Sequence, residues 1–118
     1  MNLDSNSILV KEMITAVNKK DAHQYVKNFS EDVQIYLDSE LKLSGRNSLQ
    51  HNRDEHFKKY PNVRSEIQHL VEIDNKVIMH DKVWLNPSDK GRDIVEIFSF
   101  EDSKIFKVEV IQSKDFFN

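Results

Sequence analysis

The second half of the chain constrains the fold most. Four runs rich in valine, isoleucine and phenylalanine span residues 63–73, 76–86, 93–100 and 104–112. The segments between them are short and carry turn-forming residues, as at Asp74-Asn75. Long strands joined by short turns predict a meander of antiparallel hairpins.

The first half has a helical period instead. Apolar residues in the segment 7–19 recur at i, i+4, i+7 and i+8, which is one face of an α-helix; they are Leu9, Met13, Ala16 and Val17. Asp21 lies three residues before Gln24, a pattern typical of a helix N-terminus. A second helix is therefore expected to begin there, with an apolar stripe that runs from Ala22 to Phe29.

Short strands and a third helix are expected in the middle of the chain. Apolar and polar residues alternate from Val33 to Leu37, which indicates a short strand, and a second one is expected around Leu41 and Leu43. A third helix is predicted after Gly45, with an end at Pro61, because proline interrupts helices. Its narrow inner stripe holds Leu49, Arg53, His56, Phe57 and Tyr60.

Length and composition indicate one domain over residues 1–118 with one core. The 17 basic and 20 acidic residues give a net charge of −3, and no basic stripe of the kind that nucleic acid requires is visible. No apolar run is long enough to cross a membrane, and the first residues do not resemble a secretion signal. We therefore expect a cytoplasmic protein that binds neither nucleic acid nor membranes.

The sequence gives no indication of a cofactor or a metal. It has no cysteine and only two glycines, Gly45 and Gly91, so a phosphate-binding glycine loop is not expected. His51 and His56 are five residues apart and would lie on different faces of a helix, and no third metal ligand is signalled.

The strand-rich runs carry apolar residues on both faces, as in Val77-Ile78-Met79. Three helices can cover one face of a sheet, and a chain of this length has no further helix for the other. We therefore expect a homodimer through the outer sheet face, which strand parity assigns to Val95, Ile97, Lys107, Glu109 and Ile111.

The order of several short motifs resembles a known family. The segment VNKKDAHQYVKNFSEDVQIYLD at 17–38 precedes SGRNSL at 44–49, and FEDSKI follows at 100–105. This order is similar to that of SnoaL-like polyketide cyclases and ketosteroid isomerases, within the nuclear transport factor 2-like superfamily. The resemblance covers residues 8–112 and implies an α+β cone, in which three N-terminal helices pack on a curved antiparallel sheet around a pocket for a small apolar ligand.

Catalytic roles of the isomerases can be compared position by position. An alignment without gaps places the isomerase tyrosine at Met13, which has no acidic hydrogen, and the general base at Leu37. The oxyanion-hole aspartate falls on Glu96, which keeps the carboxyl group. The nearest carboxylate to the base position, Asp38, would lie on the opposite face of its strand. Steroid isomerisation is therefore not expected.

Two carboxyl groups are the candidate catalytic residues. If Glu96 shares an inward face with Phe98 and Phe100, burial should raise its pKa; alternatively, it pairs with a basic side chain. Asp81 has the strand parity of apolar residues and would then be partly buried, or it lies exposed at a strand twist. These choices stay open at this point.

Candidate ligand-lining residues are His69, His80, Trp84, Met13, Leu37, Phe57, Tyr60, Phe98 and Val108. Two hypotheses remain. The first is a small-molecule-binding protein without catalysis. The second is a cofactor-independent enzyme that moves a proton on a small apolar carbonyl compound, with Glu96 as acid or base and Asp81 or a histidine assisting.

Overall fold

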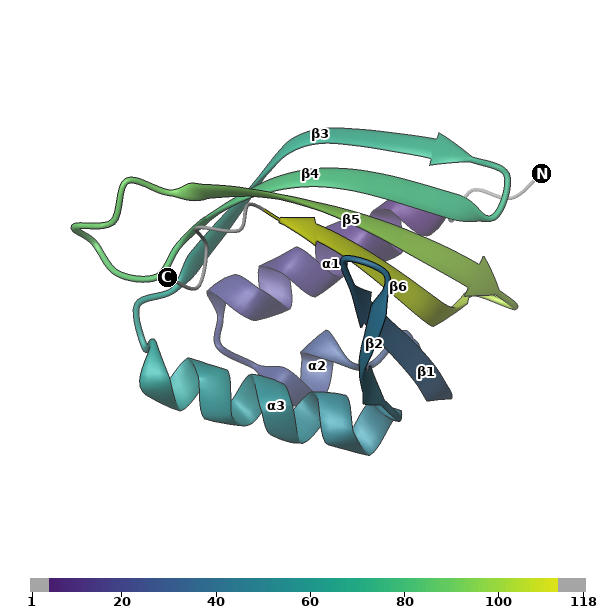
Figure 1. The fold of residues 1–118 in the computed structure, drawn as a ribbon, viewed down its shortest axis with the longest axis horizontal. Coiled ribbons are helices and arrows are strands. Elements are labelled where there is room, and N and C mark those ends of the chain that lie inside the picture. Colours follow the sequence, from purple (N-terminus) through teal and green to yellow (C-terminus); the bar gives the residue numbers. More distant parts are fainter. Residues whose placement is uncertain (1–4, 113–118) are drawn as a thin grey trace.

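The computed structural model describes residues 5–112 and confirms the expected α+β fold, with three helices and a curved six-stranded sheet (Figure 1). The elements are α1 (Asn6–Asn18), α2 (Ala22–Tyr25), β1 (Phe29–Leu37), β2 (Glu40–Ser44), α3 (Arg46–Lys59), β3 (Arg64–Ile73), β4 (Lys76–Trp84), β5 (Arg92–Glu101) and β6 (Lys104–Gln112). No helix among the described residues is both long and apolar enough to span a membrane.

The sheet is mixed rather than wholly antiparallel. Its strand order is β2-β1-β6-β5-β4-β3, and β3 to β6 form the predicted antiparallel meander. However, β1 pairs with β6 in parallel. The expectation of an antiparallel sheet is thus wrong at this one pairing. The chain leaves β1 through β2 and α3 before it enters the meander at the far edge, and the last strand returns beside the first (Figure 1).

The second helix is shorter than the sequence pattern suggests. The side chain of Asp21 accepts a hydrogen bond from the backbone N–H of Gln24 at 3.0 Å, which is the predicted N-cap. The helix nevertheless ends at Tyr25, and Phe29 begins β1 instead of extending the helical stripe. Phe29 is opposite Ile105 in the sheet and fully buried, so pairing and burial override the local helical pattern.

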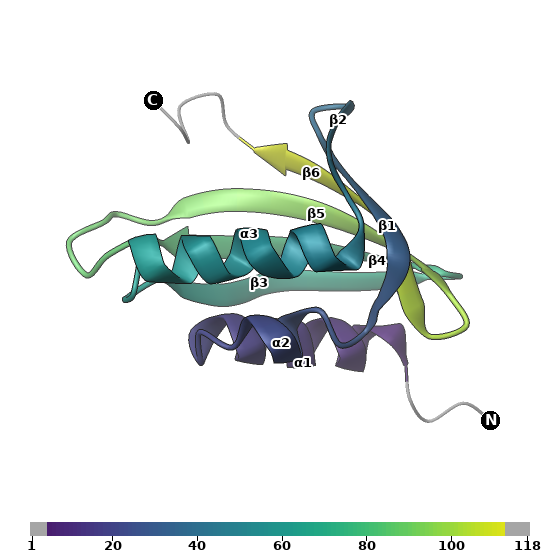
Figure 2. The same ribbon diagram turned by 90° about the horizontal axis from the view of Figure 1, so that it is seen from below.

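The helices cover the concave side of the sheet (Figure 2). Helix α1 packs on β3 and β4, α3 packs on β1 and β2, and α2 lies between the two longer helices. The residues that they enclose form one apolar core, whose most buried members include Val10, Phe29, Val33, Val77, Phe98 and Ile105. Burial of several large side chains of this kind, each worth about 1.5–3 kcal/mol, is the main source of stability.

Strand register defines the two faces of the sheet. Val77 is opposite Phe98 in the β4–β5 pair, and both are fully buried. Directly opposite residues in an antiparallel pair point to the same face. We call this helix-covered side the inner face, and the other side the outer face. In β4 the alternation is regular, since the odd-numbered residues from 77 to 83 are all buried.

Candidate functional site

The register places Glu96 on the inner face. Glu96 is opposite Met79 in the β4–β5 pair and opposite Val110 in the β5–β6 pair. Met79 is almost completely buried in the core. Glu96 also lies two residues from the buried Phe98, with which it shares strand parity. The carboxyl group of Glu96 is therefore directed toward the helices.

Asp81 lies next to Glu96 on the same face. It is opposite Ile94, which is two residues from Glu96, so the two carboxyl-bearing residues are diagonal neighbours. Diagonal positions on adjacent strands are about 7–8 Å apart, within reach of longer side chains. Asp81 is 4% exposed, so the alternative of an exposed residue at a strand twist is wrong. The only irregularity nearby, between Ile67 and His69, is in the neighbouring strand β3.

The inner face is packed at one end and accessible at the other. Around Val77, Phe98 and Val108 the inner side chains are almost completely covered. Toward the start of β5 the inner positions are only partly buried. We call this second region the open end and define it by Leu85, Ile94, Glu96 and Val110. Glu96 therefore sits where the packed core gives way to accessible apolar surface.

Both carboxyl groups have raised pKa values. Burial, with a smaller contribution from the charge of Asp81, raises the pKa of Glu96 from 4.5 to about 7, and the Arg53 guanidinium partly opposes this shift. Burial raises the pKa of Asp81 from 3.8 to about 6, although the hydroxyl of Ser65 acts in the opposite direction. Near neutral pH, Glu96 is therefore present in both its protonated and its ionised form, and a perturbed carboxyl pKa of this kind is common at functional sites.

Two helical residues complete the charged environment of the pair. The pKa of Tyr25 is raised by burial and then by the nearby charge of Glu96, whereas Arg53 lowers it. The guanidinium of Arg53 lies 5.8 Å from the centre of the Tyr25 ring and donates to the side chain of Asn52 at 2.8 and 3.1 Å. One cation and one phenol, from α3 and α2, thus face two carboxyl groups from the sheet.

The carboxyl oxygens of Asp81 differ in their partners. Oδ2 accepts a hydrogen bond of 2.7 Å from the hydroxyl of Ser65, which is itself buried. Oδ1 is buried and makes no hydrogen bond of good geometry within residues 5–112, although the backbone N–H groups of Lys82 and Glu66 lower the pKa of this carboxyl group. An unpaired buried oxygen is costly in a fold and marks a position where a ligand group can form the missing bond.

Three candidate lining residues lie outside the hollow. The rings of His69 and His80 stack on the outer face, with centres 5.4 Å apart, and His80 contacts Asp93 at 2.8 Å. The Trp84 ring lies beneath the guanidinium of Arg64 at 3.9 Å, on the same outer side. Because strand parity directs all three rings away from the helices, their assignment to a pocket is wrong.

Four other candidates belong to the packed core rather than to the open end. Met13, Phe57, Phe98 and Val108 are 0–6% exposed, so their side chains contact neighbouring core residues instead of an accessible space. Leu37 is partly buried and opposite Val110, near the end of β1. Of the residues proposed from sequence, Glu96, Asp81 and Leu37 are therefore the ones that the structure places at or next to the open end, whereas Tyr60 is partly buried against the core at the end of α3.

The two described cavities lie beside the C-terminal half of α1, and Glu96 lines neither of them. The larger, of about 560 Å³, is lined by Asn18, Lys20, Pro61, Asn62, Val63, Arg64, Ser65 and Glu66. The smaller, of about 330 Å³, is lined by residues of α1, α2 and the segments that follow them. Ser65 lines the larger cavity and bonds Asp81. In the described part of the chain, no three His, Cys, Asp or Glu side chains are arranged to hold a metal ion.

Sequence reasoning missed Arg53 and Ser65 as site residues. A signal for Arg53 was present, because it is the charged member of an otherwise largely apolar stripe on α3 that includes Leu49 and Phe57. No comparable signal exists for Ser65. Ser65 and Asp81 are sixteen residues apart and belong to different strands, so no local pattern connects them. A serine within a strand does not by itself indicate a site.

The arrangement of three helices on a curved, mostly antiparallel sheet is the nuclear transport factor 2-like or cystatin-like fold. The chain belongs to the SnoaL-like domain family, whose model matches residues 10–108. None of the curated proteins compared with this chain matches it.

Solved structures with the same fold cover most of the chain. An uncharacterised cystatin-fold protein from Novosphingobium aromaticivorans is 26% identical, with a TM-score of 0.84 over 92% of this chain and 99% of that one. A SnoaL-like protein of unknown function from Burkholderia thailandensis is 18% identical, with a TM-score of 0.79 over 92% and 93%. A Kribbella flavida protein whose name proposes a ketosteroid isomerase is 16% identical, with a TM-score of 0.77 over 96% and 81%. The last two likenesses concern the fold alone.

Proposed function

We propose that this SnoaL-like chain binds a small, largely apolar molecule at the open end, with the ligand's carbonyl or other acceptor oxygen bonded to Glu96. The observation that carries the proposal is the position of Glu96 among partly buried apolar residues, directed inward and with a pKa of about 7. A protonated carboxyl group can donate a hydrogen bond to an oxygen, and the apolar surroundings favour the hydrocarbon part of a ligand.

A matched pair of probes tests this function. Acetophenone carries a carbonyl oxygen, whereas ethylbenzene has nearly the same shape without it. We expect acetophenone to shift the NMR amide signals of Ile94 to Phe98 at lower concentration than ethylbenzene does. Glu96→Gln keeps a donor and should retain this preference, whereas Glu96→Leu should abolish it. Shifts of equal size with both probes, or shifts confined to the outer face, would refute the proposal.

A second candidate is a proton-transfer enzyme that acts on a small apolar carbonyl compound. The observation that favours it is the pair of neighbouring carboxyl groups, Asp81 and Glu96, with pKa values of about 6 and 7. Such a pair can accept and return a proton near neutral pH. Glu96→Gln separates the candidates, because it preserves ligand binding and removes proton transfer.

We predict that the protein does not isomerise ketosteroids at a measurable rate. Met13 is a buried methionine of α1 and Leu37 is an apolar residue of β1, so neither supplies a phenol or a carboxylate. Each missing group contributes on the order of 10²–10⁴ to such reactions. The measurement is the ultraviolet absorbance of the conjugated product from a β,γ-unsaturated ketosteroid. Conversion that Glu96→Gln eliminates would contradict the prediction.

We also propose that two copies associate through their outer sheet faces. The exposed fractions of Val71 and Ile111 are 48% and 52%, and the partly buried Ile78, Val95 and Ile97 lie between them on the same face. Lys107 and Glu109 are 3.9 Å apart on this face. In a two-fold symmetric dimer, the same surface of both copies forms the interface. Because this surface carries both a lysine and a glutamate, the lysine of one copy can pair with the glutamate of the other.

A further inference from the structure

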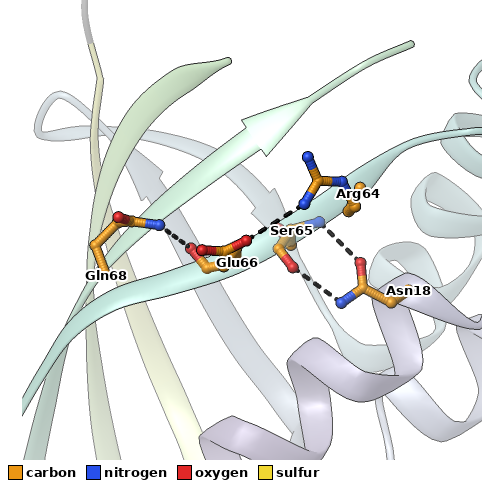
Figure 3. A network of polar contacts seen from close by, with 5 residues as sticks. All are labelled: Asn18, Arg64, Ser65, Glu66 and Gln68. Atoms are coloured by element: carbon orange, nitrogen blue, oxygen red, sulfur yellow. Dashed lines mark hydrogen bonds and ion pairs between the residues drawn. The ribbon is translucent and has the colours of Figure 1, made fainter. Parts of the chain in front are cut away.

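The amide of Asn18 fixes Ser65 from the end of α1. The side-chain Nδ2 of Asn18 donates to the backbone oxygen of Ser65 at 2.9 Å, and the backbone N–H of Ser65 donates to Oδ1 of Asn18 at 2.8 Å (Figure 3). Ser65 lies in β3, which is an edge strand. The side chain of Asn18 therefore forms hydrogen bonds with the backbone N–H and C=O groups of Ser65 that are available to a further strand at this edge.

This arrangement fixes one oxygen of Asp81. Ser65 donates its hydroxyl hydrogen to Oδ2 at 2.7 Å, and both side chains are buried. A hydroxyl group held in this orientation stabilises the charged carboxylate. The carboxyl group of Glu96 makes no comparable hydrogen bond to any residue between 5 and 112. The two carboxyl groups thus have unequal environments although they are neighbours on one face.

We infer that Ser65, held by Asn18, is a positioning residue that makes Asp81 the ionised acceptor of the pair and leaves Glu96 as its protonated donor. This inference rests on the proposed site at the open end. Two neighbouring carboxylates repel each other, so the pair retains one proton. Glu96 retains it, because no hydrogen-bond donor among residues 5–112 stabilises its ionised form. The pKa values of about 6 and 7 have the order that this argument requires.

The ligand class follows from this division of roles. Glu96 offers a hydrogen to a carbonyl oxygen, and the buried Oδ1 of Asp81 accepts one from a hydroxyl group or from an acidic C–H next to that carbonyl. In a proton-transfer step, the C–H bond breaks as its proton passes to Asp81, and the proton of Glu96 forms the O–H bond of an enol. The pair then carries the same charge as before, and a proton that returns from Asp81 to Glu96 restores the starting state.

Other charged groups face the pair and set the background for this titration. Tyr25 on α2 and Arg53 on α3 lie on the helical side, and His80 acts on Asp81 from the outer face. Arg53 favours ionisation of Glu96, whereas the backbone N–H groups of Lys82 and Glu66 and the charge of His80 favour ionisation of Asp81. These groups are unchanged in a serine variant, so a difference between variant and parent isolates the hydroxyl of Ser65.

The test is a carbon-13 NMR titration of both carboxyl groups in the ligand-free protein. In the parent, Asp81 should ionise at lower pH than Glu96. Ser65→Ala should raise the pKa of Asp81 by roughly one unit, because it loses a hydrogen bond to a charged group. Ser65→Thr should restore the parental order. Ser99→Ala is the matched control, since Ser99 is also buried but is bonded by Lys76 on the other face, and both pKa values should be unchanged.

Each outcome of the titration decides the inference. Earlier ionisation of Glu96 in the parent, or an unchanged Asp81 in Ser65→Ala, would overturn it. If Ser65→Ala does not fold, Asn18→Ala provides the second variant, which leaves the hydroxyl in place but frees the backbone of Ser65 and should shift Asp81 upward by a smaller amount. Because no ligand is present, failure of this test is separate from failure of the acetophenone experiment, which tests the proposed function itself.

Discussion

Replacement of Glu96 by leucine is expected to raise the free energy of unfolding by about 1–2 kcal/mol at about pH 8, and by much less at about pH 4.5. The pKa of Glu96 is raised by burial from 4.5 to about 7. Between these values the unfolded chain loses a proton that the folded chain keeps. The stability that protonated Glu96 contributes is therefore complete below pH 4.5 and is lost as the pH rises through 7.

The magnitude follows from the size of the shift. A shift of one unit corresponds to about 1.4 kcal/mol, and the full shift of Glu96 would give roughly 3 kcal/mol. Because the side chain is only partly buried, solvent screening reduces the expected effect to about half of this value or less. Leucine removes the charge and keeps an apolar contact with the neighbouring inner residues.

Urea denaturation of parent and variant at several pH values measures this difference. Burial lowers the pKa of His56 to about 4, so the stability associated with this group is lost as the pH falls from 6.5 toward 4. This background is common to both proteins and cancels in the difference. Glu101→Leu, at the exposed end of β5, is the control and should show no rise with pH. A gain for Glu96→Leu that is independent of pH would contradict the assignment.

A charge on the outer face should separate the proposed dimer. We expect Ile97→Glu to weaken self-association by about 100-fold or more, because it places a carboxylate of each copy in the proposed contact and removes apolar contact. Ile97 is opposite Ile78 of β4 on one side and opposite Glu109 of β6 on the other, near the centre of the sheet. Interfaces of this kind usually bury about 800 Å² on each partner, which requires most of the outer face.

Sedimentation equilibrium of the parent and the variant at tens of micromolar measures this effect. The parent should sediment as a dimer and Ile97→Glu as a monomer, with unchanged circular dichroism. Ile8→Glu is the matched control, since Ile8 is 41% exposed on α1 and lies away from the outer face. A parent that is monomeric at this concentration would refute the dimer, as would an equal loss of association in the Ile8 variant.

Glu96 and Ile97 are neighbours in β5 but lie on opposite faces of the sheet. Glu96 points toward the helices and Ile97 points away from them, because successive side chains in a strand alternate. If the strand were shifted by one residue, a carboxyl group would enter the outer face and an isoleucine the hollow. Opposite outcomes at these neighbouring positions therefore also test the register of β5.

Much of the fold could be predicted from local patterns. The period of the first helix, the cap at Asp21, the end of α3 before Pro61 and the meander after Val63 all appear in the structure. Each depends on residues that are close in sequence. The parallel pairing of β1 with β6 could not be obtained in this way, since it joins segments about seventy residues apart and follows from how the sheet closes around the helices.

The same distinction between local and long-range contacts applies to the candidate site. The sequence alone determined that Glu96 and Phe98 share one face of a strand, and that Asp81 shares the parity of Val77 and Met79, because side chains alternate with a period of two. Parity does not say which face is covered. Only the tertiary structure decided that these residues face the helices while His69 and His80 face outward, since that depends on where α1 and α3 pack. It alone joined Asn18, Ser65 and Asp81, whose contacts cross from helix to strand and from strand to strand and leave no periodic trace in the sequence.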